Sequence, residues 1–274
     1  MSQSAEAQPD PQAAARDAFF IGWEPTPKKY ARFLRPIIVA LLLITGGVAA
    51  AVAYLQRDPG TGHWDTENVR TFDGILFTRP YAMIRVPGDK PGDPPRTMLL
   101  VEDGKFGALP RVEEFVHGKA DGVAVRVTGT ILHRDGRWML ELSEGEKGMR
   151  RLTAPEEARL PPLGWPAPEV LGENVTLKGE IIDPKCYLGA MKPGSRKTHK
   201  ACAMLCISGG VPPMLVTRDA SKNETFYLLV TEEGGVANEH VLDFVGDPVE
   251  ISGRLERHGD LLLLRIAADG VRRR

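Results

Sequence analysis

An internal repeat restricts the fold of this 274-residue sequence more than any other feature. Three blocks occur twice in the same order, at 97–107, 112–118 and 123–143 in the first copy, and at 225–235, 238–247 and 249–267 in the second. Apolar and polar residues alternate in the fragments VAVRVTG and VEISGRL, which is the period of half-buried strands. The turns RDG and RHG carry the glycine that a tight hairpin needs. The repeat predicts two similar domains built mainly from β-strands.

An earlier strand extends the repeat, at 69–80 and 175–186, so that each copy has five strands with one short helix between the third and the fourth. This order resembles the OB-fold, a five-stranded barrel. The resemblance covers most of residues 66–268 and implies a mainly β fold with OB-like domains at 66–153 and 171–268. It implies no particular function. Five prolines between the copies, within 154–170, predict a semi-rigid linker because proline cannot continue a helix or a central strand.

An uncharged run at residues 36–56 precedes the repeat. At about 1.5 Å per residue, a helix of this length spans roughly the 30 Å hydrocarbon core of a bilayer. Four basic residues stand just before the run: Lys28, Lys29, Arg32 and Arg35. The positive-inside rule then places residues 1–35 in the cytoplasm, and we expect an inner (plasma) membrane protein with periplasmic barrels. The alternative is a cleaved signal peptide, because Ala51-Val52-Ala53 has the small-x-small form, although the leader before the run is long for one.

Composition and motifs narrow the possible functions. The formal net charge is −1, so no overall field attracts nucleic acid, and the expected location outside the cytoplasm also argues against such a partner. The sequence has no phosphate-binding glycine loop, no G-x-S-x-G elbow and no H-E-x-x-H motif. A binding or accessory role is therefore favoured over an enzyme.

All three cysteines lie in one basic segment of the second copy, KCYLGAMKPGSRKTHKACAMLC at 185–206, and the first copy has no counterpart to it. The end of this segment predicts a short helix that Thr198 caps. On that helix His199, Cys202 and Cys206 would share one face, and Cys186 could fold back over them. A set of three cysteines and one histidine suits tetrahedral zinc. Thiolate and imidazole also suit copper, and an iron–sulfur cluster ranks below these two metals.

The spacing of Cys202 and Cys206 resembles the Cys-x3-Cys copper sites of cytochrome oxidase subunit II and of SCO-type assembly proteins. The resemblance implies copper binding by these two cysteines. In those families the histidine follows the cysteines, whereas His199 precedes them in this sequence. The resemblance therefore extends to no other residue.

Two alternatives need no metal. In an oxidising periplasm Cys186 could form a disulfide with Cys202 or Cys206, and the protein would be a structural interaction subunit. The basic residues of the segment could instead activate a thiol pair, which would make the protein a thiol–disulfide oxidoreductase. The main hypothesis is a membrane-anchored accessory or assembly subunit with a metal site, serving a membrane redox complex or metal handling, whose partner is a membrane protein complex.

Overall fold

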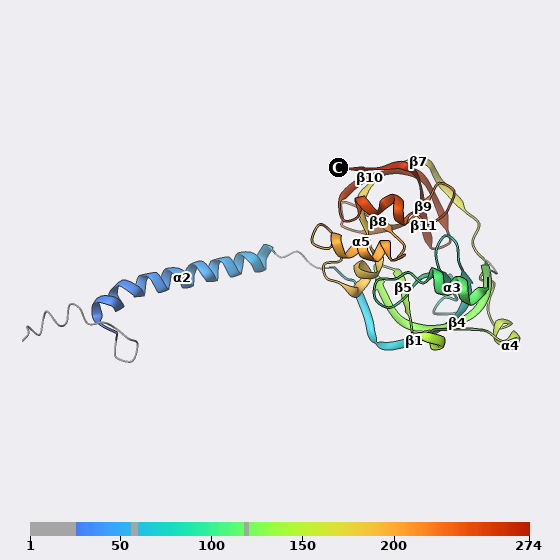
Figure 1. Ribbon diagram of the computed structural model, residues 1–274, viewed down its shortest axis with the longest axis horizontal. Coiled ribbons are helices and arrows are strands. Elements are labelled where there is room, and N and C mark those ends of the chain that lie inside the picture. Colours follow the sequence, from blue (N-terminus) through green and yellow to red (C-terminus); the bar gives the residue numbers. More distant parts are fainter. Residues whose placement is uncertain (1–25, 56–59, 118–120) are drawn as a thin grey trace, which may run out of the picture. The chain divides into compact units, whose positions relative to one another are not determined.

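The computed structural model describes residues 26–55, 60–117 and 121–274, which fall into two compact units, Met1–Asp58 and Pro59–Arg274. In the first unit, helix α2 (Lys28–Leu55) has no buried residue, and its most apolar window has a mean hydropathy of 2.4 (Figure 1). Among the described residues it is the one helix long and apolar enough to cross a membrane. It begins before the uncharged run and passes through Pro36. Part of the predicted cytoplasmic segment, residues 1–25, lies outside the described residues, and so does residue 56, the last of the predicted apolar run.

The first barrel of the second unit contains the strands β1 (His63–Phe77), β2 (Met83–Val86), β3 (Arg96–Val101), β4 (Asp121–Arg134), β5 (Arg137–Leu142) and β6 (Met149–Arg151). The sheet order is β1-β2-β3-β5-β4, and pairing of β1 with β4 closes it, while β6 adds to β4. β3 and β5 pair in parallel, and the other pairs are antiparallel. Helix α3 (Leu109–Val116) connects β3 to β4.

The second barrel repeats this topology with β7 (Glu169–Ile182), β8 (Met214–Arg218), β9 (Glu224–Thr231), β10 (Pro248–His258) and β11 (Leu261–Arg273). Its closed order is β7-β8-β9-β11-β10, with β9 and β11 parallel. A short helix α6 (Asn238–Val241) and the 3-10 turn η3 (Leu242–Phe244) occupy the place of α3. Two five-stranded barrels of OB-like order, with a helix after the third strand, confirm the predicted fold class (Figure 1).

Matching glycines show why the repeat forms barrels. Gly129 in β4 and Gly253 in β10 occupy equivalent positions. A Cβ at Gly129 would lie 1.9 Å from the carbonyl oxygen of Glu141, and one at Gly253 would lie 2.1 Å from that of Arg265. Only glycine permits the neighbouring strands to come this close. Each barrel therefore depends on a glycine at the equivalent position for its close strand packing.

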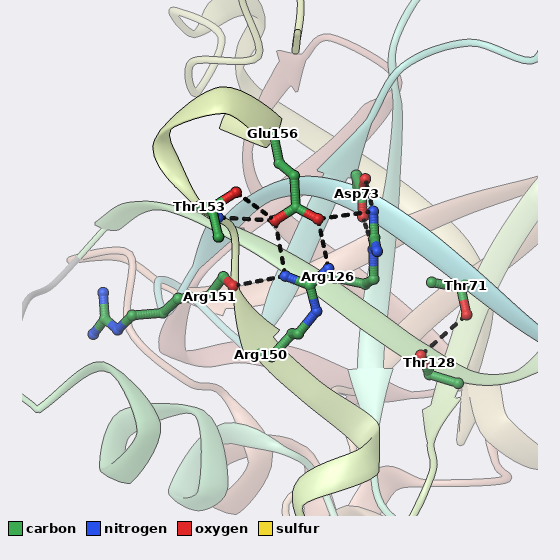
Figure 2. Close-up of polar contacts among 8 residues, drawn as sticks. All are labelled: Thr71, Asp73, Arg126, Thr128, Arg150, Arg151, Thr153 and Glu156. Atoms are coloured by element: carbon green, nitrogen blue, oxygen red, sulfur yellow. Dashed lines mark hydrogen bonds and ion pairs between the residues drawn. The ribbon is translucent and has the colours of Figure 1, made fainter. Parts of the chain in front are cut away.

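The end of the first barrel continues into α4 (Ala154–Glu157), which a polar network holds in place (Figure 2). The Glu156 carboxylate accepts hydrogen bonds from the Arg150 guanidinium at 2.7 and 2.9 Å, and from the backbone N–H of Thr153 at 2.9 Å. Arg126 lies between Glu156, at 3.5 Å, and Asp73, at 2.6 Å. The hydrogen bonds from Arg150 and Thr153 hold the pKa of Glu156 well below its usual range. The first residues of the proline-rich segment are thus fixed to the barrel.

One hydrophobic cluster spans both barrels. Its buried residues from the first barrel are Tyr81, Met83, Leu99, Val101, Leu132 and Met139, and those from the second include Ile182, Met214, Val216, Phe226, Leu228, Val230, Leu261 and Leu263. Polar contacts accompany it: the Tyr81 hydroxyl donates to the carbonyl of Leu229 and accepts from the N–H of Ala237, both at 2.9 Å. Arg134 pairs with Glu224 at 2.8 Å. The two barrels therefore pack through a shared core, in addition to the interior of each.

Candidate metal centre

The cysteine segment connects β7 to β8 and contains the π-turn η2 (Cys186–Ala190) and the helix α5 (Lys200–Ser208). The predicted cap by Thr198 is wrong, because His199 occupies the N-cap position and the Thr198 hydroxyl donates to the carbonyl of Ser195 at 3.3 Å. His199 thus lies at the start of the helix. The helix ends at Ser208, Gly209 is its C-cap, and Gly210 follows with a left-handed φ of 95°.

Cys186 lies just beyond the turn that follows Ile182, the last residue of β7, and belongs to the core that the barrels share. Asp183 turns the chain at this point, because its Oδ1 accepts the backbone N–H groups of Lys185, at 2.9 Å, and Cys186, at 3.3 Å. α5 turns Cys206 inward and leaves Cys202 half-buried. The turn and the helix bring the three sulfurs together, and all three cysteines are free thiols.

Two groups of potential metal ligands form at this point. The sulfur atoms of Cys186, Cys202 and Cys206 all lie within 4.8 Å of one another, and so do ligand atoms of Asp183, Cys186 and His199. The two groups contain all four ligands predicted from the sequence and share Cys186. In tetrahedral zinc sites, sulfurs at about 2.3 Å from the metal lie about 3.8 Å apart. Small movements would therefore suffice for the cysteines to bind a metal ion.

The donors differ in their exposure to solvent, and the pKa of one of them, Cys186, is shifted. Cys186, Cys206 and His199 are buried, at 5, 1 and 4% exposure, so solvent reaches the group chiefly at Cys202. A hydrogen bond to Cys206, burial and the charge of Asp183 all raise the pKa of the Cys186 thiol. Cys186 is therefore protonated at neutral pH.

Lys105, which belongs to the first barrel, places its ammonium group beside the sulfurs. Its Nζ lies 2.8 Å from Sγ of Cys202 and 3.9 Å from Sγ of Cys206. The hydrogen bond to Cys202 raises the pKa of Lys105, so the ammonium keeps its charge. An N–H donor next to ligand sulfurs is a common outer-shell contact of metal sites, because it offsets the negative charge of thiolates.

Lys185 fastens the cysteine segment to the same part of the first barrel. Its Nζ donates to the carbonyls of Glu102 and Gly104, each at 2.7 Å, and forms an ion pair with Glu141. The side chains of Lys185 and Glu141 are only 4 and 12% exposed. The turn that carries Lys105 is therefore held against the residue that precedes Cys186.

A backbone contact fixes the other side of this junction. The N–H of Gly107 donates to the carbonyl of Gly209 at 3.0 Å. A Cβ at Gly107 would lie 2.0 Å from the carbonyl oxygen of Gly210, and a Cβ at Gly209 would lie 2.0 Å from that of Lys105. The first barrel can therefore approach the end of α5 only because both segments have glycine there. The candidate centre thus lies where the two barrels meet.

The sequence did not indicate two residues of this centre, Asp183 and Lys105. Asp183 had a weak signal, since an aspartate before Pro184 at the end of a strand is typical of a turn that uses its side chain. Lys105 had none, because it lies 97 positions from Cys202 in the other copy of the repeat. Only the packing of the barrels brings it to the sulfurs.

The fold and the site define a class of protein: an apolar N-terminal helix followed in the sequence by two OB-like barrels, with a cysteine and histidine cluster between the barrels that could bind a metal ion. No protein-family model matches the sequence, and neither does a curated protein or a solved structure.

Proposed function

We propose that this protein is a membrane-anchored metal-binding protein that serves as an accessory or assembly subunit of a membrane redox complex, or in metal handling. The convergence of Cys186, Cys202 and Cys206 within 4.8 Å carries the proposal. These are all the cysteines of the chain, and folding gathers them at a junction that both barrels build. A disulfide would use two of them, whereas a metal ion uses all three.

Zinc and copper are the metals that fit this donor set. Zinc takes thiolate and imidazole ligands in tetrahedral sites, and the same soft ligands suit copper(I). An iron–sulfur cluster of the [2Fe–2S] type divides its ligands between two irons. The close grouping of the three sulfurs favours their binding to one and the same ion, so an iron–sulfur cluster ranks lower than zinc or copper.

The membrane location belongs to the proposal as well. Helix α2 serves as a single-pass anchor, and the basic residues at its start favour a cytoplasmic N-terminus with the barrels in the periplasm. A protein held at the membrane surface in this way would meet a membrane protein complex as its partner. An alkaline phosphatase fusion to the C-terminus should be active in a bacterial host, whereas a fusion before Lys28 should be inactive, and the reverse pattern would contradict the orientation.

A second candidate function rests on Cys202. This thiol is half-buried and lies 2.8 Å from the ammonium of Lys105, a combination typical of reactive cysteines. A thiol–disulfide oxidoreductase could use it with Cys206 or Cys186. Insulin-reduction activity that the Cys202→Ala substitution abolishes would support this function.

Elemental analysis and thiol counting test the main proposal. Full-length protein should be purified in detergent without chelator or reductant, and it should contain at least one equivalent of zinc or copper per chain. Its thiols should react with a thiol reagent only after a chelator is added. The Cys206→Ser substitution should lower the metal content, and His240→Gln, which changes an exposed histidine outside the centre, should not. Metal-free protein that takes up neither zinc nor copper would remove the proposal.

A further inference from the structure

Two buried polar atoms in the centre have no hydrogen-bond partner within the described residues: Oδ2 of Asp183 and Nε2 of His199. The two atoms lie 3.8 Å apart, which is too far for a hydrogen bond and within reach of an ion pair only when the His199 ring carries a proton, and their side chains are 0 and 3% exposed. Buried polar atoms nearly always have a partner, and a fully buried carboxylate oxygen without one is costly. These two atoms indicate a ligand between the side chains.

The nearest third donor is the sulfur of Cys186, which lies within 4.8 Å of ligand atoms of both residues. Oxygen, nitrogen and sulfur donors in one buried group suit a borderline divalent ion such as zinc. The second group, formed by Cys186, Cys202 and Cys206, offers sulfur alone and suits zinc or copper(I). Cys186 is the one residue that belongs to both groups.

We propose that the centre binds two metal ions, with Cys186 as a bridging thiolate between them. One ion binds to Cys186, Cys202 and Cys206, and the other to Asp183, His199 and Cys186. This inference rests on the proposed metal-binding function and specifies it further. It adds Asp183 as a ligand and assigns His199 to a subsite different from that of Cys202 and Cys206.

A single ion would not account for the same observations. An ion held by the three sulfurs would leave Oδ2 of Asp183 and Nε2 of His199 buried without a hydrogen-bond partner in the described part of the chain. An ion held by Asp183, Cys186 and His199 would leave the other two sulfurs, which Lys105 holds together, without a role. Two ions give every donor atom of the cluster a partner.

Charge and proton balance are compatible with two ions. Three thiolates and one carboxylate carry four negative charges, which two divalent ions neutralise. The S–H bonds of the three cysteines break as metal–sulfur bonds form, and the three protons leave to solvent without any change of oxidation state. Lys105 lies beside Cys202 and Cys206, so its charge falls on the sulfur subsite, where the ligands carry most of the negative charge.

Asp183 is held ready for such a role. Its Oδ1 accepts the N–H groups of Lys185 and Cys186, which fixes the carboxylate and directs Oδ2 toward His199. The substitution Asp183→Asn keeps an oxygen for these backbone contacts and removes the negative charge. It therefore separates a ligand role of Asp183 from its role in the turn.

Zinc stoichiometry tests the inference. Full-length protein in detergent should be freed of metal under reducing conditions, dialysed against buffered zinc, and analysed for bound zinc per chain. We expect two zinc ions in the wild type and in His240→Gln, and one in Asp183→Asn and in His199→Gln. With cobalt(II) as the probe, Asp183→Asn should keep the thiolate-to-cobalt charge-transfer absorption of the sulfur subsite.

The outcomes separate this inference from the proposed function. One zinc ion in both the wild type and Asp183→Asn would overturn the second subsite and leave the metal-binding function in place. Two ions in Asp183→Asn would place the second ion elsewhere and also overturn the inference. Absence of bound zinc, cobalt and copper in the wild type would overturn both proposals. A wild type that binds only one zinc ion overturns the inference even if a variant fails to fold.

Discussion

Replacing Lys185 by methionine should destabilise the barrel unit strongly. The ammonium of Lys185 is buried against Glu141 and donates to two backbone carbonyls of the first barrel. Methionine keeps most of the apolar stem, so little cavity forms, but the Glu141 carboxylate loses its counterion. Removing one partner of a buried ion pair costs about 3–5 kcal/mol. At about 2–4 °C per kcal/mol for a unit of this size, the melting temperature should fall by roughly 6–20 °C.

Thermal and guanidinium unfolding of the full-length protein, followed by circular dichroism, measure this change. Lys178→Met is the matched control, because Lys178 pairs with Glu250 at 3.5 Å on the surface, with side chains 59 and 38% exposed. Such a pair contributes at most about 1 kcal/mol. The double variant of Lys185→Met with Glu141→Gln should recover part of the loss. If Lys185→Met costs no more than the control, the ion pair does not hold the cysteine segment to the first barrel as argued.

Three further predictions concern the centre and its surroundings. Lys105→Met should weaken zinc binding about 10–100-fold in a chelator competition assay, since outer-shell contacts contribute that much. The control Lys192→Met, at an exposed position, should leave the zinc affinity unchanged. Equal zinc affinities of the two variants would exclude a role for the Lys105 ammonium. Tyr81→Phe should lower the free energy of unfolding by about 1–3 kcal/mol in urea titrations, because the N–H of Ala237 loses its buried acceptor. A change within experimental error would contradict the importance of this hydrogen bond. Burial raises the pKa of Glu180 from 4.5 to about 7, so its protonated form favours the folded state. The contribution of Glu180 to stability is full below about pH 4.5 and is lost as the pH rises through 7. The free energy of unfolding, measured across that range, should therefore fall with rising pH in the wild type, and Glu180→Gln should remove this slope. An unchanged slope in the variant would assign the pH dependence to another group.

The glycine contacts and the inter-barrel contacts together explain why both copies are needed. Each barrel closes by itself around its own interior cluster. The cysteine segment, in contrast, depends on Lys185, Lys105 and Gly107 for its position, and two of these residues belong to the first barrel. The first copy, which has no cysteine, therefore contributes to the centre of the second.

The sequence by itself determined the repeated barrels and the grouping of the cysteines. Alternating strands, glycine turns and an apolar run are local patterns, and their physical causes act within a few residues. The spacing of Cys202 and Cys206 on a short helix is equally local, so their proximity could be predicted. The start of that helix could not, because His199 instead of Thr198 takes the N-cap position in the folded segment.

Only the tertiary structure decided which other residues surround the sulfurs. Lys105 and Cys202 are 97 positions apart, and the contact between them arises because the barrels pack through a shared core. The folding of the segment between β7 and β8 buries Asp183 and His199 side by side, and Oδ2 of Asp183 and Nε2 of His199 have no hydrogen-bond partner within the described residues. No local pattern in the chain records these contacts, because they arise only once the barrels and the segment between β7 and β8 have folded and packed.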